Sequence, residues 1–449
     1  MERSNIDRLT QQALDHVWFP LVDGAQVRED GPGILVSAKG LDITTADGAT
    51  WLDMMGTQTR ANSLGFGQEE IAKAVYDQLV QLHYAGCFAQ AADVTVEFAA
   101  KIAELAPGRL TTTLFAGSGS EANEMSLKFA KQYHHHKGNK PRAHKVIARW
   151  DSYHGATMGA QAATDWLGTR HISEPGVPGY SHIPAPTCYR CPFGLEYPSC
   201  GVMCADWLEK QIQHEGPDFV AAFIAEPVMQ ANGVQVPPPE YFPKIREICD
   251  RYEVLFIADE VITGFGRTGE WFALKHWEVE PDIMSTAKAI TSGYFPLGAS
   301  TVSQEIAETI PTFLHIQTYN GHPGGCAAGL KTVELCERDE LVARSKEMGT
   351  YFLDALKSLE ALPIVGQVRG LGLWVAIDFA NDKKTRAPLP EGAVAAIAGR
   401  MRALGVLAGF VGTAIEMAPG YIVTREQLDR AVAVAEQAIC EISSEQNLG

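Results

Sequence analysis

Four short apolar runs in the middle of the chain predict buried β-strands. They span residues 144–150, 219–227, 253–261 and 282–288. Each run is apolar almost throughout rather than at alternate positions, which is typical of parallel strands that are covered on both faces. Residues 239–252, between two of these runs, have helical periodicity instead. The alternation of strands and helices predicts an α/β domain with a mainly parallel sheet.

The end of the chain has a different pattern. Residues 344–362 have helical periodicity, and residues 368–379 have the apolar composition of a strand. Residues 424–442 repeat apolar positions at the spacing of a long amphipathic helix. We therefore expect a smaller α+β domain in this part of the chain.

The composition is that of an ordinary globular protein. The chain has 449 residues, of which 46% are hydrophobic and 20% are charged. Its formal net charge of −17 disfavours binding to nucleic acid, because the protein lacks the positive field that attracts a phosphate backbone. No apolar run is long enough to span a membrane, and the N-terminal segment lacks the apolar core of a secretory signal. We expect a cytoplasmic location and reduced thiols.

Four of the nine cysteines lie in one proline-rich segment. They are Cys188, Cys191, Cys200 and Cys204. This spacing resembles that of a structural zinc site, in which four thiolates close a tetrahedron. A chain of this size needs no metal ion to stabilise its core, and buried free cysteines behave as small apolar residues. We expect plain thiols, with zinc as the alternative.

Ionisable residues follow three of the predicted strands. Glu226, Asp259 and Lys288 each come at the end of an apolar run. Ligands of open α/β sheets bind outside the carboxyl ends of the strands, so these side chains are candidates for one site. A lysine there loses hydration, its pKa falls, and its amine becomes a nucleophile toward carbonyl groups. A carboxylate in the same row is suited to keep a heteroaromatic nitrogen protonated.

A small-residue segment, Gly117–Ser120, precedes a predicted helix within residues 114–135. Free backbone N–H groups at such a helix start can hold a phosphate. The segment lacks the Gly-Lys-Ser/Thr of a nucleotide-binding loop, and by itself it favours a capped helix with a Gly turn. Together with a strand-end Asp and a strand-end Lys, however, it meets the needs of pyridoxal 5′-phosphate.

Several long segments resemble the class III aminotransferases, which are fold type I pyridoxal-phosphate enzymes. They occur in the family's order: AGSGSEANEMSLKFA (116–130), SYHG (152–155), FIAEPV (223–228), LFIADEVITGFGRTG (255–269), PDIMSTAKAITSGYFPLGA (281–299) and TYNGHPGGCAA (318–328). The resemblance implies an α/β fold with a large cofactor-binding domain and a smaller α+β domain built from both termini. We expect residues 1–60 to be the N-terminal part of the small domain, 61–325 the large domain and 326–449 the C-terminal part.

The resemblance also implies roles for individual residues. Lys288 corresponds to the lysine that forms the Schiff base and moves the proton, and Asp259 corresponds to the partner of the pyridine nitrogen. Thr318 corresponds to a residue that reaches the phosphate of the neighbouring subunit, which implies a homodimer with shared sites. The remaining positions that correspond to cofactor contacts are Gly119 and Ser120 at the phosphate, Tyr153 and Val261 on the two faces of the ring, and His154 and Glu226 nearby.

Two departures from the family concern the substrate. Gly409 stands where many relatives have an arginine that binds the substrate carboxylate. Thr59 and Arg60 stand in a segment where relatives often have an aromatic residue of the substrate pocket. Arg60 is therefore a candidate to supply part of the carboxylate recognition, although a surface or interface Arg paired with an acidic neighbour is the favoured interpretation.

The function that we expect is transfer of an amino group from an amine or ω-amino compound to a 2-oxo acid, with pyruvate favoured, by a ping-pong mechanism. Racemases, epimerases and lyases on the same fold are the alternative, because relatives without the arginine include them. A remote alternative is an NAD-dependent dehydrogenase, since Gly264, Gly266 and Gly269 form a G-x-G-x-x-G pattern after a strand.

Overall fold

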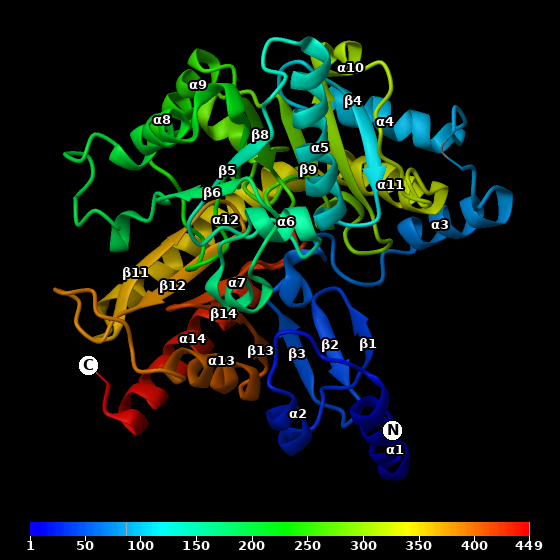
Figure 1. Ribbon diagram of the computed structural model, residues 1–449. Coiled ribbons are helices and arrows are strands. Elements are labelled where there is room, and N and C mark those ends of the chain that lie inside the picture. The colour runs from blue at the N-terminus through cyan, green and yellow to red at the C-terminus, as the bar shows by residue number, and fades with distance from the viewer. Residues whose placement is uncertain (87, 449) are drawn as a thin grey trace.

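A seven-stranded sheet forms the centre of the large domain in the computed structural model, which describes residues 1–86 and 88–448 (Figure 1). The strand order is β4-β10-β9-β8-β7-β5-β6. Strands β9, β8, β7, β5 and β6 run parallel, and β10 runs antiparallel to both of its neighbours. The bounds are β4 Leu110–Ala116, β5 Lys145–Arg149, β6 Tyr180–Ile183, β7 Val220–Ala225, β8 Leu255–Asp259, β9 Ile283–Thr286 and β10 Gly298–Ser303. All four predicted strands are confirmed, as β5, β7, β8 and β9.

Both faces of this sheet are covered by helices. Alternate residues of β7 point to opposite sides, as the pleat requires. Ala222 and Ile224 belong to the apolar core that includes the inner face of α5 (Gly119–Lys137), whereas Phe223 and Ala225 belong to the core that includes α8 (Met203–Glu215) and α9 (Tyr241–Arg251). Burial on both sides explains why these strands are apolar at every position.

The small domain contains two further four-stranded sheets. One pairs N-terminal strands β1 (Leu35–Lys39), β2 (Asp42–Thr45) and β3 (Thr50–Asp53) with C-terminal β13 (Val406–Leu407), which lies beside the blue β3 in Figure 1. The other is antiparallel, in the order β11-β12-β15-β14, with bounds Val365–Gly370, Val375–Phe379, Ala414–Met417 and Gly409–Val411.

The single strand predicted at residues 368–379 is wrong. The chain turns at residues 371–374, so that β11 and β12 form an antiparallel hairpin. The apolar pattern runs through the turn because Leu373 and Trp374 are buried as well. The C-terminal helix is confirmed as α14 (Arg425–Gln446), and Thr424 and Gln427 form a capping box at its start.

The other helices surround these sheets. Their bounds are α1 Arg3–His16, α2 Gly24–Asp30, α3 Glu69–Gln81, α4 Asp93–Leu105, α6 Met158–Ala163, α7 Leu167–Ser173, α10 Gln304–Thr309, α11 Pro323–Arg338, α12 Leu341–Lys357 and α13 Ala393–Ala403. Within the described part of the chain, no helix combines the length and apolar character needed to cross a bilayer.

Candidate active site

The predicted row of ionisable side chains is present at the carboxyl ends of the parallel strands. Asp259 is the last residue of β8, Glu226 follows β7 directly, and Lys288 comes two residues after β9. Lys288 opens the short 3₁₀ turn Lys288–Thr291 with a φ of 51°, which is uncommon for a residue with a side chain. Its pKa is lowered to about 7, chiefly by burial and then by the charge of Arg60, while Asp259 acts in the opposite direction.

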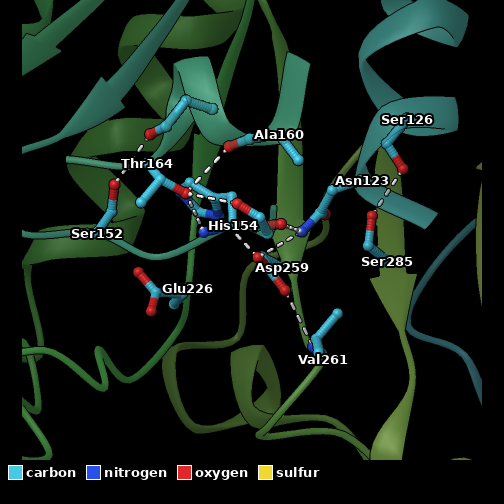
Figure 2. Close-up of polar contacts among 12 residues, drawn as sticks. Asn123, Ser126, Ser152, His154, Ala160, Thr164, Glu226, Asp259, Val261 and Ser285 are labelled. Carbon is cyan, nitrogen blue, oxygen red and sulfur yellow. Dashed lines mark hydrogen bonds and ion pairs between the residues drawn. The ribbon is translucent and has the colours of Figure 1, made fainter. Parts of the chain in front are cut away.

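Asp259 is held rigidly by three donors (Figure 2). Its Oδ2 accepts hydrogen bonds from Nδ1 of His154 at 2.7 Å and from the side-chain amide of Asn123 at 2.8 Å. Among the described residues, its Oδ1 accepts only the backbone N–H of Val261, at 3.1 Å. Nδ1 of His154 carries the proton, because an ionised carboxylate can only accept. Oδ1 therefore keeps capacity for one further donor.

Glu226 lies near His154 in the same buried region (Figure 2). Its backbone carbonyl accepts a hydrogen bond from Nη2 of Arg149 at 2.5 Å, and its Oε2 is 3.7 Å from that nitrogen. Burial raises the pKa of the Glu226 carboxyl, and the charges of His154 and Arg149 oppose that rise.

The predicted phosphate cradle lies at the start of α5. Ser118 caps the helix by accepting the N–H of Glu121, and no hydrogen bond from the N–H of Gly119 or Ser120 occurs among the described residues. A Cβ on Gly119 would lie 2.8 Å from the side chain of Val261. Glycine thus keeps the helix start accessible beside Val261.

Two other predicted cofactor contacts have different surroundings. Tyr153 is half-buried, packs edge-on against Trp166 at 6.0 Å, and has its pKa raised by burial and by Asp259. Thr318 is exposed in the single chain, and its carbonyl accepts a hydrogen bond from Tyr84 at 3.1 Å.

Arg60 is buried rather than at the surface, and it pairs with Glu416 through two hydrogen bonds. Thr59 is exposed and makes no contact that assigns it a role among the described residues. Gly409 lies opposite Glu416 in the β14–β15 pair, and the side chain of Met55 fills the space that a Cβ at Gly409 would enter. A residue with a side chain at position 409 would therefore require Met55 to move.

These residues fit pyridoxal 5′-phosphate. Oδ1 of Asp259 can accept from a protonated ring nitrogen, and the accessible helix start suits the phosphate. Lys288 supplies an amine that is largely neutral above pH 7. Tyr153 and Val261 are near Asp259, as two contacts on one ring require.

Sequence reasoning missed three residues of the site. Asn123 faces Asp259 one helical turn after Gly119, a spacing that was readable from the helix period. Glu416 interrupts the apolar run of β15, and a charge inside a buried strand was its only signal. Trp374, which donates to Glu416, had no signal of its own.

The dinucleotide-binding motif is not a ligand site in this structure. Residues 264–269 form turns without a following α-helix, and Arg267 in this segment is bonded to the carbonyls of Leu373 and Pro419, so the dinucleotide-binding interpretation is wrong. The four clustered cysteines are free thiols lining a small, mainly apolar cavity. Among residues 1–86 and 88–448 no group of three or more potential ligands is placed to hold a metal ion.

Known proteins match this chain over nearly its whole length. The family model "Aminotransferase class-III" matches residues 26–439. A putrescine–pyruvate aminotransferase from Pseudomonas aeruginosa is 37% identical over 95% of this chain and 94% of its own, and a taurine–pyruvate aminotransferase from Bilophila wadsworthia is 34% identical over 99% of both. The solved ω-transaminase from Pseudomonas jessenii in complex with PMP superposes with a TM-score of 0.94, at 30% identity, over 97% of this chain and 98% of its own. The chain therefore belongs to the class III aminotransferases, and its cofactor is pyridoxal 5′-phosphate.

Proposed function

We propose that the protein transfers an amino group from a primary amine to a 2-oxo acid, with pyruvate as the favoured acceptor, by a ping-pong mechanism. The observation that carries this proposal is the placement of Lys288 and the buried Asp259 at one edge of the sheet, where Lys288 has a pKa of about 7 and feels the charge of Asp259. Two of the relatives are named for pyruvate as a substrate, which supports that acceptor.

The cofactor, when bound, supplies an electron sink and a carrier for the amino group. Asp259 would hold the ring nitrogen and offset its positive charge, and His154 and Asn123 orient the Asp259 carboxylate. With the cofactor bound, Lys288 Nζ would be the group that takes the proton from the donor's α-carbon and holds it for return. Because one site serves both substrates in turn, the first product leaves before the acceptor binds.

Arg60 is the proposed cation for the acceptor carboxylate. Gly409 supplies no charge, and the guanidinium of Arg60 is close enough to lower the pKa of Lys288. If this assignment is right, Arg60→Ala raises KM for pyruvate at least tenfold and changes KM for an uncharged amine less than twofold. Equal changes in both KM values would assign Arg60 to structure alone.

A panel of amine donors with pyruvate and 2-oxoglutarate tests the reaction. Transamination forms alanine or glutamate in amounts equal to the carbonyl product, and omission of the acceptor leaves the pyridoxamine form of the enzyme. Racemised donor without alanine would favour an isomerase, and elimination of a donor substituent would favour a lyase.

We also propose a homodimer in which Thr318 of each subunit reaches the phosphate bound by the other. The supporting observation is a set of exposed apolar side chains on α3 and the residues after it, on α4 and on the segment before α11, where Tyr84 packs against Tyr319 and donates to the carbonyl of Thr318. The set consists of Tyr76, Leu79, Val80, Leu82, Tyr84, Val96, Leu314, Ile316 and Tyr319. Such a surface is typical of a subunit interface.

Light scattering during gel filtration tests the dimer, and Thr318→Ala is expected to weaken retention of the cofactor. A monomer with full activity would contradict both. A cytoplasmic location belongs to the same proposal, and cell fractionation tests it.

A further inference from the structure

Arg60 and Glu416 form a buried ion pair beside Lys288. Glu416 has no exposed surface and Arg60 is 8% exposed. Nε of Arg60 donates to Oε1 of Glu416 at 2.6 Å, and Nη2 donates to Oε2. The indole N–H of Trp374 also donates to Oε1. The carboxylate thus holds the guanidinium by two of its nitrogens and is itself held by a third donor.

The backbone that carries Arg60 is strained. Thr57, Gln58 and Arg60 have φ values of 44°, 68° and 62°, all in the left-handed region. Asp53 holds this turn by accepting the N–H groups of Met55 and Thr57, at 3.0 and 2.7 Å. Positive φ at side-chain-bearing residues costs free energy and persists where the surrounding structure enforces it, as happens at functional sites.

One edge of the guanidinium is left open. Within residues 1–86 and 88–448, Nη1 of Arg60 has no hydrogen-bond partner. The side chain as a whole is nine-tenths buried, but Nη1 keeps some surface that is accessible to solvent. Nη1 is therefore the part of Arg60 that a ligand can reach.

We propose that Glu416, supported by Trp374, is a positioning residue that aims Nη1 of Arg60 at the carboxylate of the substrate. The inference rests on the proposed function. It adds that Glu416 makes the site prefer substrates that carry a carboxylate. A guanidinium fixed in advance loses less side-chain freedom when the carboxylate binds, so Glu416 strengthens recognition without touching the substrate.

Binding of propionate tests the proposal without turnover. Isothermal titration calorimetry on the cofactor-loaded enzyme compares propionate with propionamide, which has the same size and no charge. We expect Glu416→Gln to weaken propionate binding at least fivefold and Arg60→Met at least tenfold, with propionamide changed less than twofold. The double variant should bind propionate as Arg60→Met does, because Glu416 acts only through Arg60.

Asp378→Asn is the matched control. Asp378 is also buried, in the neighbouring strand β12, and it pairs with Arg190 and Arg369 at 2.7 Å each. This control should leave the ratio of propionate to propionamide affinity unchanged. If Glu416→Gln does not fold, Trp374→Phe takes its place, with an expected weakening of propionate binding of at least twofold.

Unchanged or tighter propionate binding in Glu416→Gln, or in its replacement variant, would overturn the proposal, and so would an equal effect of Asp378→Asn. These outcomes are separate from failure of the proposed function. If no amine is transaminated but propionate binding depends on Arg60 and Glu416, the reaction class is wrong and the anion site stands. If pyruvate is a good acceptor but the variants bind propionate normally, only this inference is wrong.

Discussion

Replacing Asp259 by asparagine is expected to remove most of the catalytic rate while leaving the fold intact. Asp259 is 4% exposed, and both of its oxygens accept hydrogen bonds, from His154 and Asn123 on one side and from the N–H of Val261 on the other. In either orientation of an asparagine side chain, its NH₂ group would face a hydrogen-bond donor, with which it cannot form a hydrogen bond. Asparagine therefore loses the negative charge and also at least one of these hydrogen bonds.

The size of the effect follows from two contributions. A hydrogen bond to a charged group contributes about 1.5–3 kcal/mol, and removal of one partner of a buried ion pair costs about 3–5 kcal/mol. The lower ends of these ranges add to about 4.5 kcal/mol of lost transition-state stabilisation, which corresponds to roughly a 1,500-fold lower rate, at about 1.4 kcal/mol for each factor of ten.

The assay measures kcat/KM for an amine with pyruvate, together with the visible absorbance of the bound cofactor. Asp282→Asn is a suitable control, because Asp282 is a buried acceptor too, for the N–H of Phe256 at 2.8 Å and for Arg246 at 2.8 Å. The control should change kcat/KM less than tenfold. If Asp259→Asn lowered kcat/KM by less than tenfold, the assignment of Asp259 to the ring nitrogen would be refuted.

Three other predictions concern the same site. Lys288→Ala should abolish turnover and keep the thermal melting profile of a folded protein, because the amine is both nucleophile and proton carrier; near-normal turnover would remove the central assignment. Reloading of the apoenzyme with cofactor, followed by absorbance, should accelerate between pH 6 and 8 with a midpoint near 7, since only the neutral amine of Lys288 attacks a carbonyl and its pKa is about 7; a rate independent of pH in this range would contradict that value. Gly119→Ala should weaken cofactor retention in dialysis, because the new Cβ would approach Val261 to 2.8 Å, and unchanged retention would place the phosphate elsewhere.

The elements that could be predicted are those specified by neighbouring residues in the sequence, whereas contacts between residues far apart in the sequence could not be predicted. The strands around Asp259 and Glu226 were predictable, because each is a continuous apolar run between helical segments. The turn at residues 371–374 was not, because Leu373 and Trp374 face a core and continue the apolar pattern through a change of direction. Arg60 could be identified as a candidate from its position in the chain. Its orientation, however, depends on Glu416, and no local sequence pattern connects the two residues.

The sequence by itself determined the fold class and the chemistry around the cofactor. Asp259 and Lys288 lie at the ends of strands, and the phosphate segment lies at the start of α5. Local structure and the parallel topology therefore place all three at one edge of the sheet. Only the tertiary structure decided how the substrate side is arranged. Glu416 reaches Arg60 across 356 positions of sequence, and the strained turn that presents Arg60 persists because that distant carboxylate and Asp53 hold it. Such a pairing arises when N-terminal and C-terminal segments pack together, and it leaves no periodic trace in either segment.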